Sequence, residues 1–183
     1  TFVSNEGLIA GGGVIDGLVE NQSRGFVETG TIRVGTGEVL QLGGLNNRGV
    51  VEVLGGELSV NPFNGSVNSV GNIMLSDGVL RIPSQSDHGV TLFQTGGELR
   101  LSGSSNLIDA AVGVFDSPLG AEADSTTRFT GFAEVQTPVS LEAGSQLVFE
   151  TDYNGWGSNG SGDITFLGST ALASSEEPVV SFG

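Results

Sequence analysis

The chain has 183 residues, of which 31 are glycine and none is cysteine, so disulfides and thiolate metal sites are excluded. It carries 21 acidic residues against 6 basic ones, a formal net charge of −15 at pH 7 that argues against nucleic acid or an anionic lipid surface as a partner. No apolar run approaches the length of a membrane span, so we expect no membrane insertion. The chain begins at Thr1, not at methionine, and shows no signal peptide, which predicts a processed or trimmed product.

Short strands separated by glycine turns are expected from the N-terminus onward. A weak strand–turn–strand unit at 8–19 is followed by four clearer ones at 31–42, 50–60, 72–82 and 90–101. Their turn glycines are Gly37, Gly56, Gly78 and Gly97, which the numbering spaces 19, 22 and 19 residues apart. On both sides of each turn, apolar residues alternate with polar ones, the pattern of half-buried strands.

The second half of the chain follows this pattern less closely. Weaker units are expected at 139–149 and 164–172, whereas residues 103–138 fit poorly and predict an irregular insertion or loop. The segment 106–115 is the one candidate for a short helix, and it contains Gly113.

The repeat favours one all-β domain over residues 1–183, a right-handed parallel β-helix (β-solenoid) of about seven irregular coils. Each coil would pair its backbone with the coils on either side at a rise of about 4.8 Å, and inward aliphatic side chains would stack in rows. Glycine suits the corners of the coil best, because it adopts positive φ angles, and asparagine is the second most suitable residue. We therefore expect the following asparagines between strands: Asn46, Asn47, Asn61, Asn64, Asn68 and Asn72. A β-sandwich or jelly roll is the alternative fold.

Two stretches resemble coils of exported bacterial repeat proteins. The segments 29–42 and 47–60 look like the coil pattern N-x-G-x-[IV]-x-V-x-G-G-x-L-x-[LV]. Residues 147–172 are similar to a strand ending in LxFE, a glycine-rich loop and a strand of the type D-x-[IVL]-x-[VF]-x-G-x-[AT]; the matching residues are Leu147, Phe149, Glu150, Asp163, Ile164, Phe166, Gly168 and Thr170. Such coils occur in autotransporter passengers and in PEP-CTERM-type proteins, although the sorting tail of the latter is absent here.

The resemblance implies a secreted or cell-surface, extracellular protein without enzymatic activity. The ends of a solenoid present unpaired strands, which can template a further copy. We therefore expect a self-associating building block of a fibre, sheath or biofilm matrix, with the strand-like termini 1–10 and 177–182 as the interface. The alternatives are an adhesin or carbohydrate-binding module that contacts polysaccharide, and a polysaccharide-active β-helix enzyme.

Glu38, Glu57 and Glu98 each follow a turn glycine, so the repeat predicts an acidic row along the stacked coils. Such a row is either a solvated edge or a weak calcium site, because like charges on neighbouring strands repel and a cation would relieve the repulsion. Apart from calcium, no cofactor is expected.

The segment 152–163 is a second candidate for weak calcium binding. Asp152, Asn154 and Asp163 partly match the spacing of a calcium loop, but the residue types at other loop positions and the flanking helices are wrong for an EF-hand. The same segment holds Tyr153 and Trp156, the one Tyr and the one Trp of the chain, which could contact a glycan or partner or could cover the end of the solenoid.

Catalysis is not expected. His88 is the one histidine, so a serine-type triad would have to use it as the base. Its neighbour Asp87 would face the opposite side of a strand and could not orient it. The acidic residues are not accompanied by the basic cluster that lyase chemistry requires.

Overall fold

The computed structural model describes residues 2–22, 30–61, 67–82, 92–137, 139–151, 153–155, 158–160, 163–166 and 170–172. In these residues the regular structure is all strand, from β1 to β23, with no helix. Adjacent strands pair in parallel and belong to successive passes of the chain. A β-sandwich or jelly roll would need antiparallel pairs, so the parallel β-solenoid expected from the repeat is confirmed.

The coil has three faces, which the chain visits in the same order on every turn. Face 1 is a separate sheet made of β2 (Leu8–Ala10), β4 (Thr31–Val34), β6 (Val50–Leu54), β9 (Asn72–Ser76), β12 (Leu99–Ser102), β15 (Leu119–Ala121), β18 (Val139–Leu141) and β21 (Ser158–Gly160). Face 2 contains the first parts of β3 (Gly13–Asn21) and β5 (Val39–Asn47), then β7 (Glu57–Val60), β10 (Val79–Ile82), β13 (Asn106–Ala110), β16 (Thr126–Phe129), β19 (Gln146–Phe149) and β22 (Asp163–Phe166).

Face 3 is joined to face 2 through the two long strands. It contains β1 (Phe2–Asn5), the second parts of β3 and β5, then β8 (Val67–Ser69), β11 (Leu92–Gln94), β14 (Val112–Phe115), β17 (Phe132–Val135), β20 (Tyr153–Gly155) and β23 (Thr170–Leu172). In β3 the register shifts between Ile15 and Leu18, and the strand turns the corner there. From β7 onward the strands of the two faces are separate.

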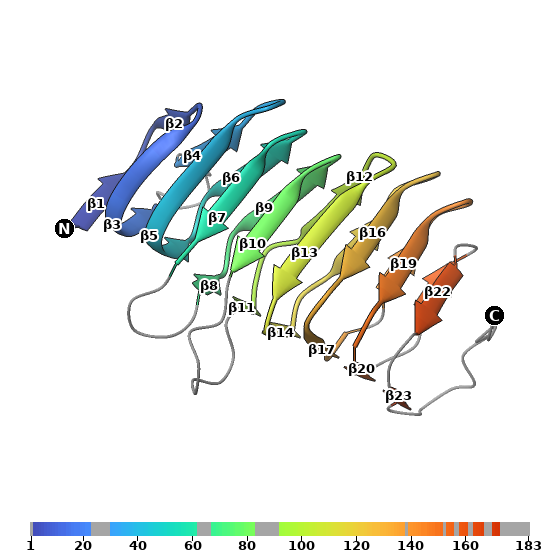
Figure 1. Ribbon diagram of the computed structural model, residues 1–183. Coiled ribbons are helices and arrows are strands. Elements are labelled where there is room, and N and C mark those ends of the chain that lie inside the picture. The colour runs from blue at the N-terminus through green and yellow to red at the C-terminus, as the bar shows by residue number, and fades with distance from the viewer. Residues whose placement is uncertain are drawn as a thin grey trace.

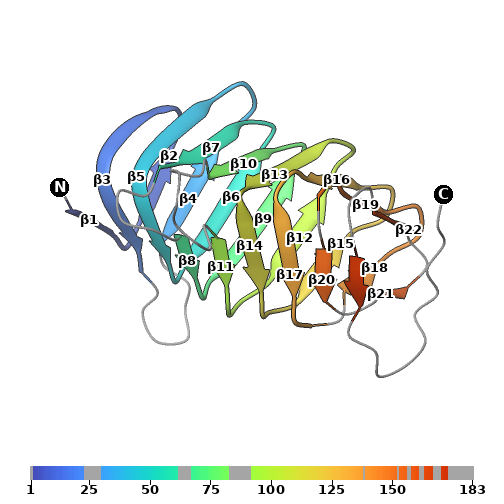
Figure 2. The same ribbon diagram turned by 60° about the horizontal axis from the view of Figure 1, so that its bottom comes forward.

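The strands form an elongated stack with the termini at opposite ends (Figure 1). In that view the face 2 strands run downward at the front, face 3 continues at the bottom, and face 1 returns behind, which makes the coil right-handed. Turning the molecule brings face 3 forward (Figure 2). Six turns run from β4 to β20, and one further pass lies at each end, close to the expected number of coils.

The interior is filled by rows of side chains, one residue per turn. The first or second residues of the face 1 strands form a buried aliphatic row of Ile32, Val51, Ile73, Leu99, Leu119 and Val139. A row on face 2 contains Leu40, Leu58, Leu80, Ile108, Phe129 and Phe149. Because fully burying one such side chain contributes about 1.5–3 kcal/mol, these rows supply most of the stabilisation of a fold that has no disulfide.

Two expectations about the organisation of the coils are wrong. Residues 103–138 are not an irregular insertion or a helix, because they contain β13 to β17 in register with their neighbours. The unit at 90–101 is out of phase with the other three, since β11 lies on face 3 and β12 on face 1. In the first half of the coil, the alternation of strand, glycine turn and strand occurs at two corners of a turn, so a local pattern cannot tell these two corners apart.

The asparagines are not confined to the corners. Asn46 and Asn47 lie in β5, Asn68 lies in β8, and Asn72 begins β9. Asn61 follows β7, whereas Asn64 lies outside the described residues. The reason is that a side-chain amide such as that of Asn47 is hydrogen-bonded inside the coil and does not need a position at a corner.

Candidate functional site

A row of polar side chains is buried at the end of face 3, on the first five turns. It consists of Asn5, Asn21, Asn47, Ser69 and Gln94. Each of the first three donates its Nδ2 to the next member, at 2.8 Å from Asn5 to Asn21, 2.8 Å from Asn21 to Asn47 and 3.0 Å from Asn47 to Ser69. We call these residues the asparagine row.

The same amides also hold the following corner of the coil. The Nδ2 atoms of Asn5, Asn21 and Asn47 donate to the carbonyl oxygens of Thr31, Val50 and Asn72, respectively. On its own turn, the Asn47 Oδ1 accepts from the backbone N–H of Gly49 at 3.2 Å. The asparagine row therefore ties each turn to the next and leaves few buried polar atoms unpaired.

At the N-terminal end, the described part of the chain leaves three strand segments paired on one side. β1 pairs with β3, β2 pairs with β4, and Gly13–Ile15 of β3 pairs with β5. Each of the three faces therefore ends in a row of backbone donors and acceptors that no described strand covers. Backbone groups in such a row can pair with an additional strand.

At this N-terminal end, apolar residues lie on both the outer and the inner surface of the coil. Phe2, Leu8 and Val14 point outward, one on each face, and are 58%, 60% and 70% exposed. Beside them the inward residues Val3, Ile9 and Ile15 pack on the core but are only partly buried. We call these six residues the N-terminal rim.

Outside the coil, arginines link carboxylates on adjacent turns. Arg33 pairs with Glu52 at 2.6 Å and Arg100 with Glu122 at 2.8 Å on face 1. On face 2, Arg81 lies between Glu57 on one side and Asp109 on the other, at 3.1 Å and 2.8 Å.

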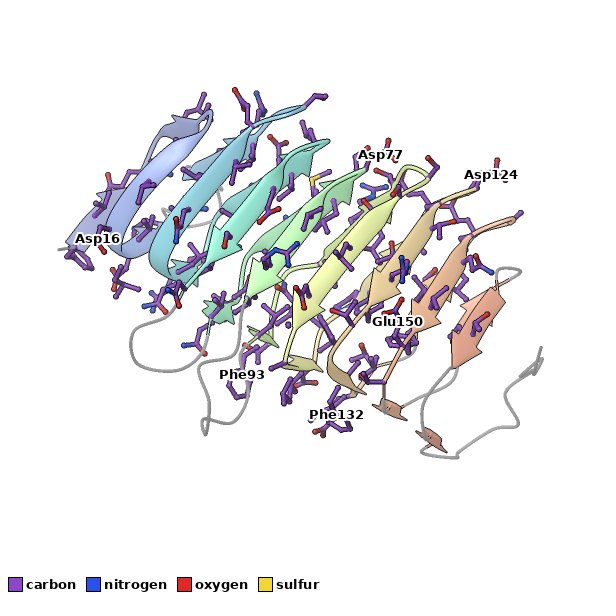
Figure 3. The ribbon with its side chains drawn as sticks, in the orientation of Figure 1. Asp16, Asp77, Phe93, Asp124, Phe132 and Glu150 are labelled. Atoms are coloured by element: carbon purple, nitrogen blue, oxygen red, sulfur yellow. The ribbon has the colours of Figure 1, made fainter. Side chains whose placement is uncertain are left out.

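At the C-terminal part of face 2, Arg128 pairs with Glu150, which lies near β19 (Figure 3). Its guanidinium also donates to the same carboxylate through Nε, at 2.7 Å. The cross-turn pairs reduce the repulsion expected in so acidic a coil.

The acidic row predicted from the turn glycines is not formed. Glu57 lies opposite Val39, one position away from Glu38, and is neutralised by Arg81. Glu98 lies at a different corner, beside Asn72, whose Oδ1 accepts from the Glu98 backbone N–H at 2.9 Å. The out-of-phase unit at 90–101 is the physical reason, since its glycine turn joins face 3 to face 1 and not face 1 to face 2.

The candidate calcium segment 152–163 contributes strands to the coil. Asn154 belongs to β20 on face 3 and Asp163 to β22 on face 2, whereas Asp152 lies outside the described residues. Among the residues that the structure describes, no group of three His, Cys, Asp or Glu could hold a metal ion. Calcium binding by this segment stays a prediction.

The aromatic pair and the histidine are described only in part. The backbone of Tyr153 is in register with Ala133, a buried position of face 3. Trp156, Asp87 and His88 lie outside the described residues, as does the terminal stretch 177–182. The described residues contain no helix that is long and apolar enough to cross a membrane.

The asparagine row, the cross-turn ion pairs and the open rim are features of a repeating scaffold, and the fold defines the chain as a parallel β-solenoid. A scan of protein-family models, a search of curated proteins and a search of solved structures each found no match.

Proposed function

We propose that the protein is a non-enzymatic, extracellular structural protein whose copies stack end to end in a cell-surface fibre, sheath or biofilm matrix. The observation that carries this proposal is the N-terminal rim. A soluble protein rarely leaves an apolar patch next to an unpaired strand edge unless another surface covers it.

The occupant that we propose for the rim is a second copy of the chain. A coil of the same width and strand direction would continue the rows of Val3, Ile9 and Ile15 and would pair with the free backbone groups of all three faces at once. Such a contact joins two different ends of the molecule, so it does not close on itself and generates a filament.

The distribution of exposed apolar residues supports this assignment. The large apolar side chains that are well exposed in the described residues are Phe2, Leu8, Val14, Leu18, Val39, Leu54 and Val70. The first four lie in β1 to β3, at the N-terminal end of the coil. An interface at that end would cover them together.

The negative net charge of the chain opposes the association and makes it dependent on salt concentration. Two copies with a net charge of −15 repel each other, and salt screens this repulsion over a Debye length of about 10 Å at 0.1 M. We therefore expect longer assemblies as the ionic strength rises.

Sedimentation velocity and negative-stain electron microscopy of the purified chain test the proposal. Val14→Lys and Phe2→Lys place a charge on the rim at outward positions, so they should shift the protein toward monomer without unfolding it. Leu54→Lys is the matched control, because Leu54 is an outward residue of β6, away from the rim. A chain that stays monomeric at every salt concentration, or a control variant that dissociates as much as the rim variants, would contradict the proposal.

A further inference from the structure

A groove of about 380 Å³ lies at the outer end of face 3, over the first turns of the coil. Arg48 and Val70 line it at equivalent positions on adjacent turns, since their backbone N–H groups donate to the carbonyl oxygens of Asn21 and Asn47. Both side chains reach solvent, and Val70 is 52% exposed. The groove therefore presents a guanidinium on one turn and an apolar side chain on the next.

Arg48 differs from the other arginines that the structure describes. Carboxylates on adjacent turns pair with Arg33, Arg81, Arg100 and Arg128. Arg48 has no ion pair with a described residue, because Gln22 and Val70 occupy its position on the two neighbouring turns. Glu20, the one carboxylate of the groove lining, accepts from the Gln22 Nε2 at 2.7 Å.

A guanidinium offers a planar set of N–H donors that fits a carboxylate. Since the described part of the coil gives Arg48 no such partner, a carboxylate from another segment or another molecule suits this position. An apolar group that comes next to that carboxylate in sequence would contact Val70. The groove thus favours an acidic peptide segment that continues with apolar residues.

The position before Arg48 recurs along the whole coil, at the end of face 3. The residues in register there are Asn47, Ser69, Gln94, Phe115, Val135, Gly155 and Leu172. Leu172 ends β23, which lies at the opposite end of the stack from β1 (Figure 1). The segment 173–183 therefore follows, in the sequence, the same corner of the coil that carries Arg48 near the N-terminal end.

This segment has the residues that the groove favours, in the required order. Glu176 and Glu177 are followed directly by Pro178, Val179 and Val180. Pro178 disfavours a helical conformation of the residue before it and has no backbone N–H of its own, which favours an extended chain.

The distances along the coil also agree. If a second copy continues the coil, its Arg48 lies three turns beyond Leu172 of the preceding copy, a separation of about 14 Å. Glu176 and Glu177 come four and five residues after Leu172, a reach of about 13–18 Å for an extended chain. Val70 lies one turn further, within the reach of the residues that follow Glu177.

We propose that the segment 173–183 of one copy binds along this groove of the next copy, where Glu176 or Glu177 pairs with Arg48 and the residues Pro178 and Val179 pack on Val70. The inference rests on the end-to-end stacking proposed above. It adds to that stacking a peptide connection that extends past the junction of the two coils and onto the third and fourth turns of the neighbouring copy.

Disulfide trapping tests the contact, because the chain has no cysteine of its own. Arg48→Cys combined with Glu177→Cys should give a ladder of covalent oligomers on a non-reducing gel after mild oxidation of the assembled protein. Gln41→Cys combined with Glu177→Cys is the matched control, because Gln41 is an exposed residue of the same strand as Asn47 but lies on face 2. The control pair should give no ladder.

Sedimentation velocity tests the ion pair separately. Arg48→Gln should weaken the association of copies about two- to fivefold, the effect of losing one exposed ion pair. Gln41→Glu makes the same change in net charge at a distant position and should weaken the association less.

Three results would overturn the inference and leave the stacking intact. These are assembled protein that forms no ladder, equal ladders from the two cysteine pairs, and a disulfide that closes within one chain. A chain that sediments as a monomer at every salt concentration would instead overturn the stacking, and this inference with it.

Discussion

The Nδ2 of Asn21 donates at 2.8 Å to the Oδ1 of Asn47, one turn further along the coil, and at 3.0 Å to the carbonyl oxygen of Val50. The Asn21 side chain thus makes two bonds to the neighbouring turn, one to a side chain at the end of face 3 and one to a backbone carbonyl at the start of face 1. An aliphatic residue of similar size would fill the space but remove both of these bonds between the turns.

Replacing Asn47 by alanine should destabilise the coil far more than replacing Asn46, the residue beside it in β5. Asn47 is buried and bonds to Asn21, Ser69, Gly49 and Asn72. Its loss should lower the free energy of unfolding by about 1–3 kcal/mol for each buried group that is left unpaired. Asn46→Ala, at an outward position, should change it by no more than about 0.5 kcal/mol.

Urea denaturation followed by circular dichroism measures both values. Equal destabilisation by the two variants would show that the asparagine row does not hold adjacent turns together.

The alternation of apolar and polar residues predicts the fold class, because it marks the strands wherever the flanking units of the repeat show the same pattern. The prediction of strands fails at 103–138 because several inward positions there are small or polar. Ala110, Ala121 and Ala133 are buried in the core, and buried Asn106 bonds to Thr127. These strands form because their backbones pair with the adjacent turns, and the local sequence pattern does not contain that information.

The asparagine row could have been found from the recurrence of a polar residue two positions before a glycine. Asn5 precedes Gly7 and Asn47 precedes Gly49 in this way, and both side chains accept from the glycine N–H at 3.2 Å. The cross-turn partners could not have been predicted in the same way, because turns of unequal length are brought into register. Asn21 and Asn47 are paired although they are 26 residues apart in sequence, whereas Arg33 and Glu52 are paired 19 residues apart.

Gly49 should not tolerate a side chain. A Cβ atom there would overlap the carbonyl oxygen of Gly30 on the preceding turn, which is backbone and cannot move away. That oxygen accepts from the Val50 N–H at 2.9 Å, so a shift would also break a bond between turns. Gly49→Ala should therefore lower the melting temperature by several degrees, a loss of the order of 1–3 kcal/mol from overpacking.

Gly120→Ala is the control for this change. A Cβ on Gly120 would meet the Glu98 carboxylate at 3.5 Å, an ordinary contact with a flexible side chain. Calorimetry of both variants should show little change for Gly120→Ala. Equal melting temperatures for the two would exclude close packing at the Gly49 corner as a source of stability.

Removing Arg81 should make stability more dependent on salt than removing Arg33 does. Arg81 lies between two carboxylates on different turns, Glu57 and Asp109, whereas Arg33 pairs with Glu52. All of these groups are partly exposed, so each pair should contribute no more than about 1 kcal/mol. Without Arg81, Glu57 and Asp109 would repel each other in a chain that is already highly negative.

Melting temperatures of Arg81→Ala and Arg33→Ala, measured from low to high sodium chloride, test this expectation. The deficit of Arg81→Ala should be the larger at low salt, and both should shrink as salt screens the charges. A deficit that does not change with salt would show that the aliphatic stem of Arg81, and not its charge, stabilises the coil.

Truncating Phe129 should open the core between two turns. Its ring stacks on Phe149 with centroids 4.6 Å apart and meets the edge of Phe115 at 5.9 Å, so it joins face 2 to face 3 through the interior. Phe129→Ala should cost about 3–5 kcal/mol, from lost burial and the cavity left behind.

Phe132→Ala serves as the comparison, since Phe132 is half-buried at the surface of face 3, where Figure 3 shows it at the edge of the molecule. Its loss should cost less than half as much, because water fills the space. Denaturation of both variants decides the matter. If the two costs were equal, the aromatic contacts inside the coil would contribute no more than surface packing, and the continuity of the core along the axis would rest on the aliphatic rows alone.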